Sequence, residues 1–469
     1  AENASIRFGR WNGRRMPSTK GQWKRVGLYF RAIDGNTKAR LWIRFDRDKK
    51  HPPVALDDIR LRTATEDEYT RAYNGWRKGY PARDLSPRPD DGKHLALTIH
   101  KLKNGFDPPR PFVIWAIGSS WTNMLGMGET LRQEIRRRFP NAPPIVYKKH
   151  VGSSAPFELT RGWVRQFVVS EQPDLLLLYG HGETEGLEKL LKEFRKRSTA
   201  DVIVPSLHIL MRDGSISDKV LDTPYWSEKE KVAERYGVEF VRNRHEWADY
   251  MKEHGLKLEV DKKNGLLKDA VHQSDYGALV INENIARHFT ANVDPAYRPE
   301  ERQRRLTAKN PQSIRPIETV AVSGKWALEH DKLISTEKGA TMTVTFQGNR
   351  LDLIGHVAPD GGTADVEIDG KPASKAPAFF MTYIEPGAKN SGRHMKGDRA
   401  PHAVILGENV VPQSWTIELI DDEGNFEVTG SETGKDGRGN ILDPFTSDSG
   451  QIIMEPELWR NKTVRRGKN

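Results

Sequence analysis

The stretch FVIWAIGSSWT, residues 112–122, decides the fold of this chain. Its apolar run from Phe112 to Ile117 is unbroken, and such a run suits a β-strand that is buried on both faces. The glycine and the two serines that follow predict a tight turn at the end of that strand. A strand of this kind belongs to a parallel sheet that helices cover on both sides.

Strand-like and helix-like patterns alternate in the residues that follow. Short apolar runs predict the strands, and apolar residues at helical spacing predict the helices between them. This alternation implies right-handed crossovers and a parallel sheet, the α/β fold class. The expected strands are 112–118, 145–147, 174–179, 201–205 and 238–241, and the expected helices are 127–139, 156–169, 187–197, 228–236 and one that begins after Ser274.

Both flanks show a different texture, in which polar and apolar residues alternate between turn clusters. Such alternation predicts antiparallel strands, over 26–31, 40–45 and 54–61 before the sheet and over 340–346, 351–354, 364–368 and 415–419 after it. Prolines within 62–110 indicate loops and a boundary. The sequence therefore predicts an amino-terminal β-rich domain over 1–110, a central domain over 111–295, an arginine-rich linker over 296–316 and a carboxy-terminal β-sandwich over 317–469.

The composition excludes several classes of protein. The 469 residues are 36% hydrophobic and include no cysteine, so disulfides, thiolate nucleophiles and iron–sulfur clusters are excluded. The net charge of +10 comes from mixed runs that suit the wet faces of helices, or an acidic partner such as an acidic polysaccharide. We expect no nucleic-acid partner, because no binding signature is present, and no membrane span, because the apolar runs are far shorter than about 18 residues.

Chemically reactive residues follow the expected strands at their carboxyl ends. These segments are Gly118-Ser119-Ser120-Trp121, His150-Val151-Gly152, Gly180-His181-Gly182 and, before the last helix, Asp269-Ala270-Val271-His272. Ligands of open parallel sheets bind at that edge, where these loops converge. A serine hydroxyl needs an adjacent base, an imidazole can be that base, and a carboxylate can hold the imidazole in the required tautomer. All the parts of acyl transfer are therefore expected on one rim, and neither a metal nor a cofactor is required.

The order of these segments resembles that of the SGNH (GDSL) hydrolases over residues 111–291. Its most specific part is LLKDAVHQSDYG, residues 266–277, followed by the segment at Gly118. The resemblance implies a three-layer α/β/α domain with Ser120 as nucleophile, His272 as base and Asp269 as the residue that orients it. It also implies that the backbone amides of Ser120 and Gly152 bind the oxyanion.

This chain departs from the family pattern at two places. Ser119 stands where the family usually has an aspartate, so Ser119 is a rival nucleophile, although Ser120 is preferred. Gly182 stands where the family has an asparagine that donates to the oxyanion, so the oxyanion hole uses fewer donors, the Gly182 amide, or a substitute side chain such as His181.

Three further residues are candidates for substrate contact. His181 and His208 are each either loop histidines satisfied by their neighbours or contacts to the substrate or oxyanion. Trp121, next to the nucleophile, is either a packing residue or a wall on which a sugar stacks.

Both flanks also resemble known modules, with less specific motifs. The segments TVTFQGNRLDLIG (343–355) and GGTADVEIDGK (361–371) resemble galactose-binding-like β-sandwiches, and VALDDIRL (54–61) is similar to the closing strand of jelly-roll carbohydrate-binding modules. Such sandwiches accompany SGNH domains in secreted esterases that act on polysaccharides. The start at Ala1 rather than Met fits a removed signal peptide, and we expect a secreted or periplasmic protein.

Together these observations predict a serine esterase that removes O-acyl groups, first of all O-acetyl, from a polysaccharide or oligosaccharide. Two alternatives stay open. One is a carbohydrate-binding protein that has lost catalysis, and the other is an O-acetyltransferase that uses the same three residues.

Overall fold

The computed structural model describes residues 4–8, 12–15, 22–23, 41–45, 60, 62–106, 109–151, 163–180, 182–261, 265–290, 319–329, 332–346, 351, 353, 355–356, 358–375, 400–401, 404–407, 409–411 and 413–460. The chain divides into two compact units, residues 1–84 and residues 85–469.

The first unit contains a three-stranded antiparallel sheet and one helix. The strands are β1 (Ala4–Phe8), β2 (Asn12–Arg15) and β3 (Leu41–Phe45), in the order β2-β1-β3. Strand β3 matches the strand expected over 40–45, whereas the segments 26–31 and 54–61 lie outside the described residues except for residue 60. Helix α1 (Glu66–Arg77) begins at a capping box of Thr65 and Glu68, within a region where the prolines had indicated loops. A jelly-roll topology for this unit stays a prediction.

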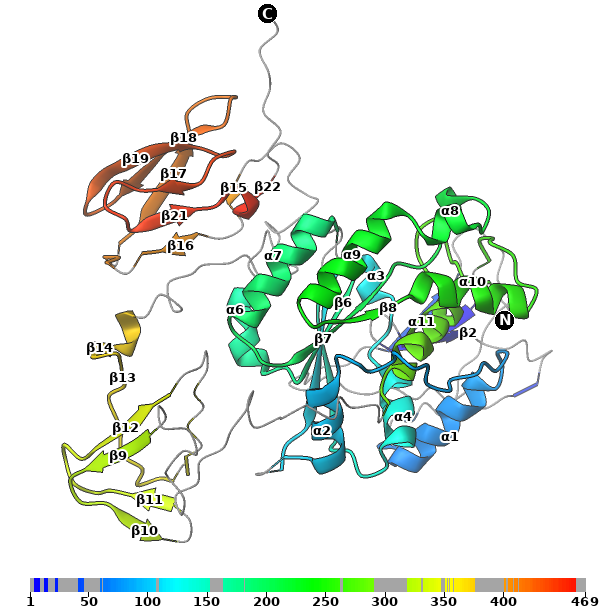
Figure 1. Cartoon of the computed structure of the whole chain (residues 1–469), viewed down its shortest axis with the longest axis horizontal. Helices are drawn as coiled ribbons and strands as arrows, with labels where there is room; N and C mark the ends of the chain where they lie inside the picture. The colour runs from blue at the N-terminus through cyan, green and yellow to red at the C-terminus, as the bar shows by residue number, and fades with distance from the viewer. Residues whose placement is uncertain are drawn as a thin grey trace, which may run out of the picture. The chain divides into compact units, whose positions relative to one another are not determined.

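The second unit is built on a five-stranded parallel sheet, as the sequence predicts. Its strands have the order β5-β4-β6-β7-β8. They are β4 (Phe112–Gly118), β5 (Ile145–Val151), β6 (Leu175–Tyr179), β7 (Asp201–Pro205) and β8 (Glu239–Val241). Figure 1 labels β6, β7 and β8 of this sheet. Gly118 pairs with Val151 on one side and with Tyr179 on the other, so the carboxyl ends of three strands meet where the reactive segments begin.

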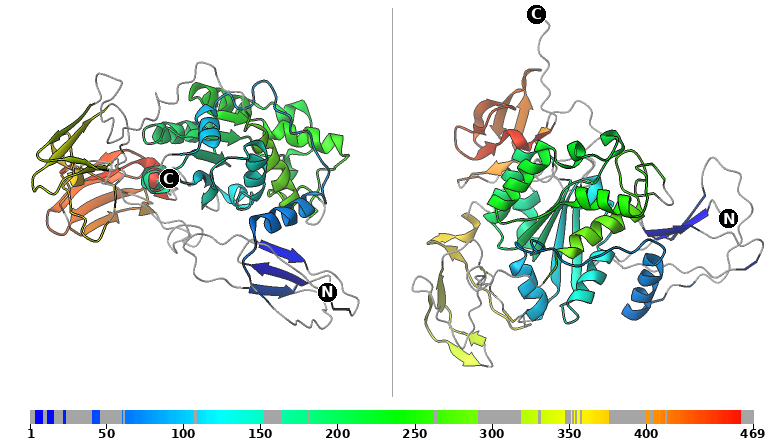
Figure 2. Two further views of the ribbon diagram at one scale, coloured as in Figure 1. Left: turned by 90° about the horizontal axis from the view of Figure 1, so that it is seen from below. Right: turned by 45° about the vertical axis from the view of Figure 1, so that its right-hand side comes forward.

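Helices cover both faces of this sheet (Figure 2). On one face α6 (Trp163–Glu171), α7 (Thr184–Arg195) and α9 (Pro224–Arg235) enclose a core that includes Trp115, Leu178 and Phe194. On the other face α4 (Glu129–Arg138) and α10 (Asn243–Glu253) pack on α11 (Asp275–Arg287). Shorter helices are α3 (Ser120–Asn123), α8 (Asp218–Leu221) and the 3₁₀ turn η1 (Met211–Asp213).

The expected helices are present with shifted ends. The helix expected over 156–169 is described from Trp163 onward, because residues 152–162 lie outside the described ranges. The last helix begins after Ser274, whose hydroxyl accepts a hydrogen bond from the Gly277 amide and so caps α11. Helix α10 was not expected, since its sequence is largely polar.

Helix α2 (Ala96–Asn104) precedes residue 111, where the sequence places the start of the central domain, yet it is bonded to the sheet. Its Thr98 amide donates to Asp201 Oδ2 over 2.7 Å, and its Lys101 Nζ lies 2.8 Å from Asp174 Oδ1. Lys101 and Asp174 are both buried. The amides of Gly92 and His94 also donate to Glu239 of β8, and residues from 85 onward form one unit with the sheet.

The carboxy-terminal part consists of small antiparallel sheets. Two three-stranded sheets share one core around Phe426, Ile452 and Trp459. They are β17 (Trp415–Leu419), β18 (Asn425–Gly430) and β19 (Gly434–Asn440), and β16 (Ile405–Leu406), β21 (Ile452–Met454) and β20 (Phe445–Thr446). The strand expected over 415–419 is β17.

The remaining strands form two-stranded pairs. These are β9 (Thr319–Ser323) with β12 (Thr341–Thr345), β10 (Ala327–Glu329) with β11 (Lys332–Ile334), β13 (Glu367–Ile368) with β14 (Lys371–Pro372), and β15 (Ala400–Pro401) with β22 (Trp459–Arg460). Strands expected over 340–346 and 364–368 correspond to β12 and β13, whereas Leu351 and Leu353 lie in no strand. The short 3₁₀ turns η2 (Ala373–Lys375) and η4 (Pro456–Leu458) complete the list. A galactose-binding-like fold for this part stays a prediction.

Candidate active site

The turn after β4 requires a glycine at its first position. Gly118 has φ 148°, and a Cβ there would collide with the Tyr179 carbonyl oxygen and with Thr122 Oγ1. The Thr122 hydroxyl donates to that same carbonyl, which ties the turn to the end of β6. Glycine at 118 therefore lets the segment that carries the two serines lie directly against β6.

The two serines of this turn have different environments. Ser119 is buried and caps α3, with its Oγ accepting from the Trp121 amide over 3.4 Å. Ser120 is the first residue of α3, and its Oγ lies 2.8 Å from Nε2 of His272. Only Ser120 of this pair is hydrogen-bonded to an imidazole within the described residues, so the rival position Ser119 has a capping role instead.

The structure brings Ser120, His272 and Asp269 into one line of hydrogen bonds, although Ser120 and His272 are 152 residues apart in the chain. His272 Nδ1 lies 2.9 Å from Asp269 Oδ1 and 3.0 Å from Oδ2. Because an ionised carboxylate only accepts, Nδ1 carries the proton and Nε2 presents its lone pair to the Ser120 hydroxyl. This is the tautomer in which the imidazole can act as a base.

Asp269 is held ionised by its own loop. Burial alone would raise the pKa of Asp269, but hydrogen bonds from the amides of Val271 and His272 and from the His272 ring keep that pKa below its ordinary value. The two amide bonds measure 3.0 and 2.8 Å and end on Oδ1. The spacing of three residues from Asp269 to His272 therefore closes a tight turn that fixes the carboxylate under the ring.

Trp121 links the serine turn to the histidine loop. Its indole Nε1 donates to the Val271 carbonyl over 2.6 Å, and its own carbonyl accepts from Gln273 Nε2 over 2.8 Å. These two bonds flank His272 on both sides along the chain, so they fix the ring relative to Ser120. The indole N–H of Trp121 is thus used in a hydrogen bond to the histidine loop, a role that the sequence did not predict. Nothing in the sequence indicated a role for Gln273.

The backbone amides near Ser120 include donors without a partner. Within the described ranges, the amides of Ser120 and Gly182 make no hydrogen bond and can serve an oxyanion. Gly182 has φ 60° in the loop after β6. Gly152 and His181, the other two residues proposed for this purpose, lie outside the described residues.

His208 lies in the core instead of on the surface. The ring is fully buried, its Nδ1 accepts from the Tyr179 hydroxyl over 2.6 Å, and it tilts against Trp247. Burial and the nearby Arg244 guanidinium lower the pKa of His208 to about 3, so the ring is neutral. With no surface open to solvent, the ring supports the site from beneath rather than presenting itself to a substrate.

A half-buried lysine holds the far end of α3. Lys149 of β5 donates to the carbonyl of Gly126 over 2.8 Å and to the carbonyl of Asn123 over 3.3 Å. Burial lowers the pKa of Lys149 to about 8. The ammonium group therefore remains mostly charged at neutral pH and interacts favourably with the carbonyls that end the helix.

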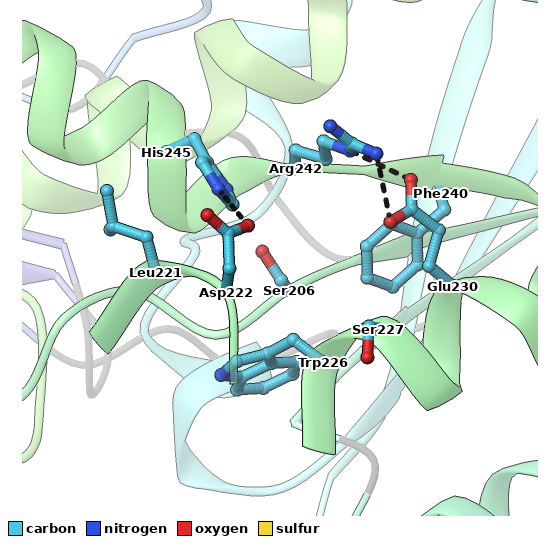
Figure 3. A pocket seen from close by; sticks show the side chains of 9 residues that line it. All are labelled: Ser206, Leu221, Asp222, Trp226, Ser227, Glu230, Phe240, Arg242 and His245. Carbon is cyan, nitrogen blue, oxygen red and sulfur yellow. Dashed lines mark hydrogen bonds and ion pairs between the residues drawn. The ribbon is translucent and has the colours of Figure 1, made fainter. Parts of the chain in front are cut away.

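A small pocket opens at the carboxyl edge of the same sheet (Figure 3). The indole of Trp226 forms one wall, an Asp222–His245 pair joined over 2.8 Å forms another, and an Arg242–Glu230 pair lies opposite. Ser206, Leu221, Ser227 and Phe240 complete the lining. The pocket lies where β7 and β8 end, whereas the Ser120 turn follows β4, and β6 lies between β4 and β7 in the sheet.

In the part of the chain that the structure covers, no three His, Asp or Glu side chains are grouped so that they could hold a metal ion. None of the helices in that part combines the length and the apolar character that a bilayer crossing needs.

Comparisons with known proteins give similarity to solved structures alone. No family model matches the chain, and no curated protein matches it. A GDSL-like lipase of Parabacteroides merdae is 14% identical, with a TM-score of 0.29, over 39% of this chain and 97% of that one. The acetylxylan esterase Axe2 of Geobacillus stearothermophilus is 15% identical, with a TM-score of 0.32, over 42% and 99%. An alpha/beta hydrolase from the metagenome of Lake Arreo, Spain, is 17% identical, with a TM-score of 0.29, over 38% and 94%. Scores this low carry no argument about the activity of this chain.

Proposed function

We propose that this chain is a serine esterase that removes O-acyl groups, first of all O-acetyl, from a carbohydrate. The observation that carries the proposal is the line of hydrogen bonds from Ser120 Oγ through His272 to Asp269, at 2.8 and 2.9 Å. The Ser120 hydroxyl has a base on its proton, the base has a carboxylate on its far nitrogen, and the Ser120 amide is free to bind an oxyanion.

The first half of the reaction forms an acyl-enzyme. Ser120 Oγ attacks the ester carbonyl while its proton passes to His272 Nε2, and the carbonyl oxygen becomes an oxyanion at the backbone amides. The intermediate then collapses, the C–O bond to the sugar breaks, and His272 returns its proton to the departing sugar oxygen. Asp269 stabilises the imidazolium without taking a proton.

The second half restores the enzyme with water. His272 takes a proton from water, whose oxygen attacks the acyl carbon on Ser120. The bond to Ser120 Oγ then breaks, the serine recovers its proton from His272, and the carboxylic acid leaves.

The charge of the chain supports a carbohydrate substrate. The net charge of +10 suits an acidic polysaccharide, and such attraction weakens with salt. The acetyl group comes from the resemblance to the SGNH hydrolases and belongs to the proposal.

Acetate release from acetylated polysaccharides, together with hydrolysis of an activated acetyl ester, tests this function. We expect Ser120→Ala to lower kcat at least about 1,000-fold, because the nucleophile is gone. Ser119→Ala is the matched control and should cost less than about tenfold, since it removes only a cap. Activity that survives in Ser120→Ala and disappears in Ser119→Ala would transfer the nucleophile to position 119. Lack of hydrolysis by the wild-type chain on every acetylated substrate would refute the esterase.

A further inference from the structure

Helix α9 presents two donors to one backbone carbonyl. Tyr225 and Lys229 are four residues apart and therefore lie on the same face of the helix. The Tyr225 hydroxyl donates to the Gly182 carbonyl over 2.6 Å, and Lys229 Nζ donates to the same oxygen. A hydroxyl and an ammonium thus converge on one peptide group of the loop after β6.

Both donors are built into the structure. Lys229 is fully buried, and its Nζ lies 4.1 Å from the centre of the Tyr225 ring, which compensates part of its charge. Burial, and then the Glu183 carboxylate, raise the pKa of Tyr225 to about 12, so the phenol keeps its proton and donates it. A fully buried lysine on an otherwise amphipathic helix is costly unless it is paired, which points to a function at its partner.

The loop that they hold begins against the serine turn. A Cβ on Gly180 would lie 2.8 Å from Ser119 Oγ and 2.9 Å from Trp121 Cε3, so the backbone at 180 touches the residues on both sides of Ser120. The Gly182 peptide follows two residues later. Its orientation therefore decides which group of this peptide faces away from α9.

Peptide geometry decides what the held carbonyl leaves on the other side. In a trans peptide the carbonyl of Gly182 and the N–H of Glu183 point in opposite directions. With the carbonyl held on α9, the Glu183 N–H points away from α9, and it makes no hydrogen bond among the described residues; nor does the Gly182 N–H. If this peptide were flipped, the Gly182 carbonyl oxygen would point away from α9 in place of the Glu183 N–H. A carbonyl oxygen repels an oxyanion, whereas an N–H binds it.

We propose that Tyr225 and Lys229 are positioning residues that fix the Gly182 carbonyl on α9 and thereby keep the amide of Glu183 available as an oxyanion donor. This inference rests on the proposed esterase function and deepens it. The two side chains do not touch the substrate, and they act through the peptide group that joins Gly182 to Glu183.

The test compares Tyr225→Phe, Lys229→Met and the double variant with the wild type. The control is Lys231→Met, which removes an exposed lysine from the same helix. Steady-state hydrolysis of an activated acetyl ester gives kcat and KM, and a fluorophosphonate titration counts the active serines. Inhibition by phenylboronic acid, whose adduct with serine mimics the tetrahedral intermediate, reports oxyanion binding separately.

We expect kcat per titrated site to fall about 10- to 100-fold in each single variant, with KM within about threefold, since a displaced donor acts on the transition state. The affinity for phenylboronic acid should fall in parallel. The loss of kcat in the double variant should be much smaller than the product of the two single losses, because both side chains hold the same oxygen. Lys231→Met should match the wild type.

Two outcomes would overturn the inference, and they are distinguishable from failure of the esterase. If Tyr225→Phe keeps the wild-type kcat per titrated site, the positioning role is refuted while the esterase stays intact. This variant removes only one oxygen atom, so it decides the question even if Lys229→Met does not fold. A loss confined to thermal stability and to the number of titrated sites would make the role merely structural. A wild-type chain without ester hydrolysis would remove the proposed function, and the positioning role with it.

Discussion

Asp269 accepts three hydrogen bonds from its own loop, two from amides and one from the His272 ring. These hydrogen bonds fix the position of the carboxylate and keep it ionised before any substrate binds. The main consequence is the tautomer of His272, because a group that only accepts requires a proton on Nδ1. The ability of His272 Nε2 to act as a base therefore depends on the Asp269 carboxylate.

Asp269→Asn is expected to lower kcat about 10⁴-fold, since an amide can donate to Nδ1 and so favours the tautomer with Nε2 protonated. KM should change little. The measurement is steady-state hydrolysis of an activated acetyl ester, with Asp275→Asn, an exposed acid at the start of α11, as the control. Full activity in Asp269→Asn would show that His272 is oriented by something else.

At the scale of elements, the site depends on loops that are joined to one another across the sheet. Trp121 of the serine turn binds the histidine loop, and Gly118 allows β4 to approach β6. Underneath, α2 closes the amino end of the sheet through Lys101 and Asp174, to which Arg110 adds two further bonds. Burial would raise the pKa of Asp174, but the Arg110 and Lys101 cations hold it below its ordinary value.

A chain that begins at residue 85 should unfold cooperatively, whereas one that begins at residue 111 should not. The shorter chain lacks Lys101 and Arg110 and leaves Asp174 as an uncompensated buried charge, which costs about 3–5 kcal/mol. Urea unfolding followed by tryptophan fluorescence makes the comparison. Equal stability of the two chains would show that α2 is dispensable and would support a boundary at residue 111.

At the scale of the whole molecule, one buried ring links stability to pH. The pKa of His208 is lowered to about 3 in the folded chain by burial and then by Arg244, whereas an unfolded histidine takes up its proton near pH 6.5. Between these values the unfolded chain binds one proton more than the folded chain. The stabilisation is therefore complete above about pH 6.5 and is lost as the pH falls from there toward 3.

We expect the free energy of unfolding to lose about 1.4 kcal/mol per pH unit from this ring, or about 2 kcal/mol between pH 6.5 and 5. Urea titrations of the wild type and of His208→Gln at several pH values isolate the effect, because the other titrating groups are common to both chains. His245 is more exposed to solvent than His208, so His245→Gln serves as the control. Parallel pH curves for the wild type and His208→Gln would contradict the account.

The sequence predicted what is encoded locally and missed what long-range packing decides. The unbroken run at 112–117 and the alternation after it predicted the parallel sheet, and the short motifs around Ser120 and Asp269 predicted the three aligned residues. Gln273 and Lys229 gave no such signal, because their partners are far away in the chain. Trp121 was predicted only as a packing residue or a sugar contact, and its bonds to the histidine loop were not foreseen. Helix α2 was missed because the sequence alone does not distinguish a buried, ion-paired lysine such as Lys101 from an exposed one.

The most direct test of the central claim identifies the serine that reacts. The wild-type chain is treated with a fluorophosphonate, digested, and the modified peptide is sequenced by mass spectrometry, alongside His272→Ala and Ser119→Ala. We expect one label per chain on Ser120. Labelling should be retained in Ser119→Ala and slowed at least about 1,000-fold in His272→Ala, because the hydroxyl then lacks its base. A label on Ser119, or one that forms equally fast without His272, would contradict the claim.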